Sequence, residues 1–124
     1  MKAAVIVFSD PKTGSEESLG RLFNALATAY DFKQRGDDVQ ILFQGAGTRW
    51  AGELGKSEHP AHALFEAVKD KMTGVSCGCA DVFGATEEAE KSGFDLIKEN
   101  MVPGTTGFPS FSKLVDAGYT IFTF

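Results

Sequence analysis

The stretch GVSCGCADVFG, residues 74–84, contains the two cysteines of the chain, Cys77 and Cys79, separated by one glycine. A short apolar run leads into the cysteines, and small residues typical of the start of a helix follow them. In a parallel α/β protein, a turn from strand to helix lies at the carboxyl edge of the sheet, where such folds place their chemistry. The stretch therefore predicts a parallel α/β fold with two thiols at its functional edge, a position that favours sulfur or redox chemistry.

Strand and helix patterns alternate along the rest of the chain. Apolar runs predict strands at four places, residues 3–8, 39–43, 75–77 and 120–124. Residues 96–102 fit either a helical turn or a short edge strand. Helical patterns follow four residues that commonly begin helices, namely Ser15, Pro60, Thr86 and Ser110. Because such alternation builds a parallel sheet with helices on both faces, we predict a single three-layer α/β/α domain over residues 1–124. Its sheet is expected to have five mainly parallel strands, in a flavodoxin-like architecture.

The composition disfavours several classes of partner. A net charge of −5 and an isoelectric point near 4.9 argue against binding to nucleic acid or to an anionic membrane surface. No apolar stretch approaches the ~20 residues that span a bilayer, and no charged-then-apolar leader precedes the first predicted strand. We therefore expect a cytoplasmic protein, in which cysteines are more often reduced or reactive than joined in a disulfide.

The two cysteines have a reactive and a structural interpretation. A thiolate is the nucleophile in sulfur exchange, and a helix that begins near Ala80 would stabilise a thiolate on Cys79 through its dipole. Cys77, at the end of a covered strand, would be the more buried thiol. We therefore expect Cys79 to react first and Cys77 second. The alternative is that both are small buried hydrophobic residues without a chemical role, as in a non-catalytic partner subunit.

Two stretches carry a resemblance to a known family. Residues 75–85 resemble the sulfur-relay proteins of the DsrE/DsrF/TusD group, in which a cysteine at the end of the third strand precedes a turn containing Phe-Gly and a helix. Residues 110–124, SFSKLVDAGYTIFTF, are similar to the last helix, Gly-Tyr and final strand of those proteins. Aligned without a gap, Cys79 matches a cysteine found in many members. The position tied to sulfur transfer in the relay branch of the family aligns near Ser76. It aligns with Cys77 when the alignment is shifted by one residue.

The resemblance implies a DsrE-like subunit that carries sulfur as a persulfide and needs no cofactor. The thiolate of Cys79 or Cys77 would attack the persulfide of a donor, and the outer sulfur would then pass to an acceptor thiol. The implied partners are a sulfur donor or acceptor protein and further copies of the chain, as in a trimer or a hexamer. Eleven phenylalanines are many for so small a domain, and we expect the subunit interface in residues 44–59 and 96–108.

Three further residues are candidates for binding the sulfur substrate. Arg49 and Trp50 lie in a glycine-bearing loop, residues 44–59, that follows the second predicted strand and should reach the same sheet edge as the cysteines. Arg49 or Lys12 can stabilise a thiolate or a persulfide. Trp50 can cover a pocket, pack against a neighbouring subunit, or serve only to anchor the loop.

The loop at residues 9–16 allows a second function. Its hydroxyl groups and amides precede a helix, which suits a phosphate, and with Trp50 as a stacking partner an FMN site is conceivable. The alternative function is therefore a flavodoxin-like module that binds a small molecule or a nucleotide. Three acids, Asp10, Glu16 and Glu17, would repel a dianion, so a capped helix start explains this loop better.

The histidines allow a metal site but do not favour one. His62 and Glu66 are four residues apart on a predicted helix, a spacing that can hold a metal ion. The chain has only two histidines, and Pro60 separates them. We therefore expect a surface pair and no metal.

Overall fold

The computed structural model, which describes all 124 residues, contains one five-stranded sheet in which every neighbouring pair of strands is parallel. The strands lie in the order β4-β3-β2-β1-β5, and their bounds are β1 Lys2–Val7, β2 Asp38–Phe43, β3 Met72–Ser76, β4 Leu96–Ile97 and β5 Tyr119–Thr123. The α-helices are α1 Glu16–Gln34, α2 His62–Val68, α3 Cys77–Val82, α4 Thr86–Lys91 and α5 Phe111–Asp116. Three 3-10 segments complete the chain, η1 Pro11–Thr13, η2 Gly45–Gly52 and η3 Lys69–Lys71.

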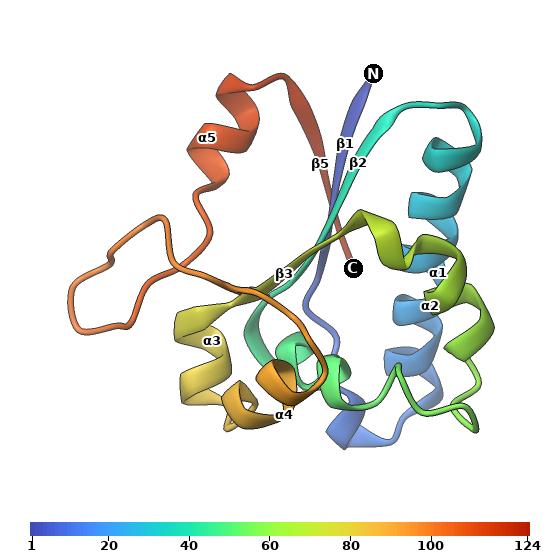
Figure 1. The fold of residues 1–124 in the computed structure, drawn as a ribbon, viewed down its shortest axis with the longest axis horizontal. Helices are drawn as coiled ribbons and strands as arrows, with labels where there is room; N and C mark the ends of the chain where they lie inside the picture. The colour runs from blue at the N-terminus through green and yellow to red at the C-terminus, as the bar shows by residue number, and fades with distance from the viewer.

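The direction of the connections decides which face of the sheet each helix covers. The chain moves steadily outward from β1 through β2 and β3 to β4, and then crosses back to place β5 on the other side of β1. Because crossovers between parallel strands are right-handed, α1, α2 and the α3–α4 pair lie on one face and α5 lies on the other. Figure 1 shows α5 across the strands from α1 and α2. The predicted three-layer architecture is confirmed, with a strand order that differs from the 2-1-3-4-5 order of flavodoxin.

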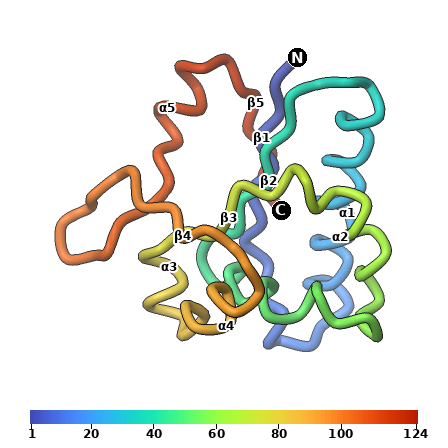
Figure 2. Tube along the Cα trace, in the orientation of Figure 1, coloured from blue at the N-terminus to red at the C-terminus, as the bar shows by residue number.

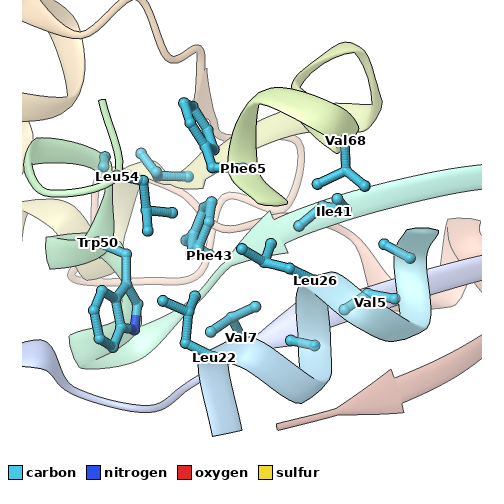
Figure 3. Close-up of a cluster of buried hydrophobic side chains, with 14 of the residues drawn as sticks. Val5, Val7, Leu22, Leu26, Ile41, Phe43, Trp50, Leu54, Phe65 and Val68 are labelled. Atoms are coloured by element: carbon cyan, nitrogen blue, oxygen red, sulfur yellow. The ribbon is translucent and has the colours of Figure 1, made fainter. Parts of the chain in front are cut away.

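The main hydrophobic core lies between the sheet and the helices of the α1 face. Figure 3 shows alternate residues of β1 and β2 packed against α1 and α2, with Trp50 and Leu54 extending this cluster beyond the end of β2. Each fully buried aliphatic or aromatic side chain of this kind contributes roughly 1.5–3 kcal/mol. The α5 face has a much smaller buried cluster, which consists of Ala4, Ile6, Leu42 and Leu114.

Helix α1 begins where the sequence predicts. The Ser15 hydroxyl accepts a hydrogen bond from the backbone N–H of Ser18 (3.1 Å), and Glu16 and Glu17 occupy the first turn, where the helix dipole favours acids. The interpretation of the preceding loop as a capped helix start is therefore confirmed. Ser110 caps α5 in the same way, through the N–H of Lys113 (3.3 Å).

Helix α2 is shorter than its pattern predicts. The apolar spacing after Pro60 continues to Met72, but the α-helix ends at Val68 and a 3-10 turn follows it. Met72 instead opens β3, where it pairs with Ile41 of β2. Pairing with the neighbouring strand thus overrides the helical periodicity of the last residues. The ambiguous stretch after residue 95 contains the short edge strand β4, which pairs with β3.

Helix α3 begins three residues earlier than predicted. The sequence suggested a strand through Cys77 and a helix from about Ala80, but β3 ends at Ser76 and α3 starts at Cys77. The cause is a cap, because the Ser76 hydroxyl accepts a hydrogen bond from the backbone N–H of Cys79 (3.3 Å). Both cysteines therefore lie in the first turn of a helix rather than at the end of a strand.

A long connection, residues 98–109, which we call the strap, joins β4 to α5 and loops out from the body of the domain (Figure 2). Asn100 and Phe108 exchange two backbone hydrogen bonds, each of 2.8 Å, which hold the two ends of the strap together. The carbonyl of Gly107 accepts a hydrogen bond from the N–H of Gly78 in α3 (2.6 Å). This bond fixes the returning arm of the strap against the helix that carries the cysteines.

None of the helices has both the length and the apolar composition needed to cross a membrane.

Candidate functional site

The two cysteines are free thiols in different environments. Cys77, the first residue of α3, is partly exposed, whereas Cys79 is only 7% exposed. The expectation that Cys77 would be the more buried thiol was wrong, because it depended on the helix starting near Ala80. With the helix starting at Cys77, Cys79 lies within its first turn and faces the protein. The physical basis for ranking Cys79 first is therefore lost.

Cys77 contacts a hydroxyl group that the sequence did not single out. Its Sγ lies 3.4 Å from Oγ1 of Thr106 in the strap, a distance at which sulfur and oxygen share a hydrogen bond. The turn that presents Thr106 is held by Thr105, whose hydroxyl donates to the carbonyl of Val102 (2.7 Å) and accepts from the N–H of Gly107 (3.2 Å). Thr106 therefore lies at Cys77 because of a locally stabilised turn.

Two glycines allow the strap to approach the cysteines so closely. A Cβ on Gly78 would lie 2.8 Å from the ring of Phe108 and 2.9 Å from the carbonyl oxygen of Gly107. Gly107 has a positive φ of 112°, and a Cβ there would lie 2.6 Å from the Cβ of Lys98. The glycine between the two cysteines was the one sequence signal for this contact, since glycine often marks a close approach of two backbones.

The structure separates Arg49 from the thiols. Its Nη1 forms an ion pair with Asp10 (2.9 Å), and its Nε donates to the carbonyl of Phe83 (3.2 Å). The guanidinium also lies over the Phe83 ring, 5.4 Å from its centroid. Arg49 thus links the loop after β1 to the far end of α3, and its charge is already paired.

Trp50 anchors its loop. The indole is 2% exposed, and its N–H donates to the carbonyl of Ser9 (2.7 Å). Of the three roles suggested by the sequence for Trp50, the structure shows that it anchors the loop. Because its side chain is buried within the domain, Trp50 is not available to pack against another subunit. Trp50 is also among the residues that line a surface cavity.

That cavity has a volume of about 720 Å³. Three parts of the chain form its walls: η1 with the start of α1, η2 with the loop that follows it, and the turn from α3 to α4. It brings together three of the predicted site residues, Lys12, Arg49 and Trp50. Neither Cys77 nor Cys79 lines it. The predicted site therefore divides into a thiol site at the start of α3 and a cavity at the end of α3.

The histidine pair has local structural contacts. Nδ1 of His62 lies 2.9 Å from the carbonyl oxygen of Leu54, and its Nε2 lies 3.9 Å from a carboxylate oxygen of Glu66. No group of three or more His, Cys, Asp or Glu side chains is arranged to hold a metal ion. His62 and Glu66 therefore form a local pair on the surface of α2.

His59 is a titratable group in the cavity wall. Its ring packs edge-on against Trp50, with 5.8 Å between ring centroids, and its Nδ1 accepts the N–H of Ala61 (3.0 Å). Desolvation by burial is the largest effect on this ring, and it lowers the pKa of His59 below its ordinary value of 6.5. The neutral ring therefore predominates at pH 7, and its proton is on Nε2 because Nδ1 accepts a hydrogen bond.

We expect an NMR titration of His59 to give a midpoint below pH 6.5. The variant His62→Asn leaves a single imidazole signal to follow. Because the pKa of His59 is lower in the folded chain than in the unfolded chain, its contribution to stability is present above about pH 6.5 and is lost as the pH falls through the lowered value. A midpoint at or above 6.5 would contradict the burial of this ring.

Comparisons with known proteins agree with the resemblance seen in the sequence. The chain is 32% identical over 121 residues to the uncharacterized protein MJ0733 of Methanocaldococcus jannaschii, and the match covers 98% of this chain and 93% of that protein. No solved structure gave a significant match. The family model described as the DsrE/DsrF-like family matches residues 1–124, and the chain therefore belongs to that family.

Proposed function

We propose that this protein is a persulfide carrier in a cytoplasmic sulfur relay and that Cys77 is its nucleophile. The thiolate of Cys77 attacks the outer sulfur of a donor persulfide, R–S–SH. A new S–S bond forms on Cys77, the donor S–S bond breaks, and the donor leaves as the thiolate R–S⁻ while the transferred sulfur keeps its proton. An acceptor thiolate then removes the outer sulfur by the same exchange, so no net oxidation occurs and no cofactor is required.

One observation carries this proposal: a partly exposed free thiol lies in the first turn of α3, in contact with the hydroxyl of Thr106, in a chain of the DsrE/DsrF-like family. An in-line attack on a persulfide needs an approach path to Sγ, which favours Cys77 over the buried Cys79. The thiol of Cys77 donates to Oγ1 of Thr106. Once the thiol is ionised, the hydroxyl of Thr106 can donate to the sulfur instead and stabilise its charge.

Thr106→Val should slow the alkylation of Cys77 at pH 7 about fivefold, the factor that corresponds to the loss of one hydrogen bond worth about 1 kcal/mol. It should also move the half-maximal rate of alkylation to higher pH, because the thiolate loses a donor. Thr106→Ser keeps the hydroxyl and should restore both values. Thr123→Val, at an exposed position of β5, is the matched control. An unchanged pH profile in Thr106→Val would remove Thr106 from the site.

We further propose that the chain forms a homo-oligomer through the strap and α3. Three large apolar side chains are exposed there, Val82 (74%) at the end of α3 and Met101 (64%) and Val102 (36%) in the strap. By contrast, the apolar residues of the other expected interface segment, residues 44–59, are largely buried within the domain. Because the strap contacts α3, exposed apolar side chains on these two elements are typical of an interaction site.

Light scattering of the wild-type protein should therefore give a mass above that of one chain. Met101→Asp should lower this mass, because it introduces a charge into the expected interface. Val115→Asp is the matched control, since Val115 is 59% exposed on α5, which is not part of the expected interface. A monomeric wild type, or equal effects of the two substitutions, would count against an interface at the strap.

A further inference from the structure

The cavity at the far end of α3 contains none of the residues that the proposed sulfur chemistry uses. Phe83, which lines it, follows the last residue of α3, and this six-residue helix separates it from Cys77 by about 9 Å along the helix axis. A volume of about 720 Å³ is within the usual range of small-molecule sites, about 300–1,000 Å³.

The apolar part of the cavity is held rigidly before any ligand arrives. Trp50 is fixed by the hydrogen bond from its indole to Ser9, and the ring of Phe83 lies beneath the guanidinium of Arg49. Leu19 of α1 adds an aliphatic surface. Because Arg49 is itself held by Asp10 and by the Phe83 carbonyl, binding at this surface would require little ordering of side chains.

The charges around the cavity are balanced in sign. Its lining includes three basic residues, Lys12, Arg49 and Lys56, and three acidic residues, Glu16, Glu53 and Glu88. Arg49 pairs with Asp10, and Lys56 pairs with Glu53 (3.1 Å). The side chains of Lys12, Glu16 and Glu88 form no ion pair, so charges of both signs remain available to a ligand.

This balance disfavours a phosphate and favours a ligand that carries both charges. A dianion would approach three carboxylates, and Glu16 and Glu17 already occupy the first turn of α1, where its dipole would otherwise attract an anion. A zwitterion can place a carboxylate near Lys12 and an ammonium group near Glu88. The neutral ring of His59 has an Nε2–H that can donate to an acceptor on the ligand.

We propose that the cavity binds a small zwitterionic molecule of the amino-acid or short-peptide class, with an apolar side chain that packs on Phe83 and Leu19. This site is distinct from the thiol site, and its occupancy does not depend on Cys77.

The test is a titration with the dipeptide alanyl-phenylalanine, followed by the fluorescence of Trp50, the only tryptophan in the chain, and by amide NMR. We expect a saturable fluorescence change, with shifted amide signals at three glycines of the lining, Gly14, Gly52 and Gly84. N-acetylation or C-amidation of the dipeptide should each weaken binding about tenfold, which corresponds to about 1.4 kcal/mol for one lost charge contact.

Charge-reversal variants then test the assignment of the two charges. Lys12→Glu and Glu88→Lys should each weaken binding about tenfold or more. Lys113→Glu, on α5, is the control for the first change, and Glu90→Lys, an exposed position of α4 outside the cavity, is the control for the second. Both controls should bind like the wild type.

Three results would overturn the proposal: no saturable change up to about 10 mM dipeptide, equal binding of the charged and the capped peptides, or stronger binding of inorganic phosphate at the same glycines. A site with a Kd of about 1 mM would be about 90% occupied at this concentration, so the titration covers millimolar and tighter binding. Cys77→Ser should bind the dipeptide normally, so a failure of the sulfur-relay proposal and a failure of this proposal give different results.

Discussion

Cys77→Ser should reduce sulfur loading from a sulfane-sulfur donor to background, a loss of more than about tenfold in rate, because a serine hydroxyl is not ionised at neutral pH and cannot replace the thiolate. Cys79→Ser should still load, since its buried side chain offers no approach path to a donor persulfide. The measurement is a mass spectrum of the native protein after incubation with the donor. Lys71 and Lys91 flank both cysteines without a cleavage site between them, so fragment ions must assign the added sulfur within one tryptic peptide.

The two variants control for each other, because both replace a thiol with a hydroxyl within the first turn of α3. Their melting temperatures should be compared first, so that a loss of loading is not confused with a loss of folding. Sulfur loading that disappears in Cys79→Ser and persists in Cys77→Ser would contradict the proposed nucleophile. Loading that persists in both variants would remove the cysteines from the reaction.

Much of the fold could be predicted from the sequence because it depends on local signals. The apolar strand runs, and the caps at Ser15 and Ser110, identify elements whose residues are close together in the chain. The alternation of strands and helices then predicts the layers, since right-handed crossovers leave few arrangements. The start of α3 was predicted wrongly, because Ser76 can end a strand or cap a helix equally well. Only the bond that it makes to Cys79 decides between the two.

The candidate site could be predicted only in part, because its contacts join distant segments. The structure brings Lys12, Arg49 and Trp50 together, since they follow the carboxyl ends of the neighbouring strands β1 and β2. The cysteines, one strand further along, were expected to join them. Instead α3 directs Cys77 toward Thr106, 29 residues later in the chain. No local pattern in a loop of prolines, glycines and threonines identifies which hydroxyl will reach a given thiol.

Gly47→Ala should destabilise the protein by about 3 kcal/mol or more, at the upper end of the usual cost of overpacking. Gly47 lies in η2, and a Cβ there would overlap the carbonyl oxygen of Val7 and lie 2.9 Å from its carbonyl carbon. These are backbone atoms of a buried central strand, so they cannot move aside as a flexible side chain can. The methyl group must therefore push η2, with Arg49 and Trp50, away from β1.

Urea unfolding of two alanine variants measures this effect against a matched control. Gly20 lies in α1 with no atom within 4 Å of its would-be Cβ, so Gly20→Ala should stabilise the protein by roughly 0.5–1 kcal/mol through its higher helix propensity. The same chemical change thus has opposite signs at the two positions. Because η2 lines the cavity, Gly47→Ala should also change the fluorescence of Trp50 under native conditions, where Gly20→Ala leaves it unaltered. Equal stability of Gly47→Ala and the wild type would mean that η2 does not pack on β1, and the cavity would then lack one of its walls.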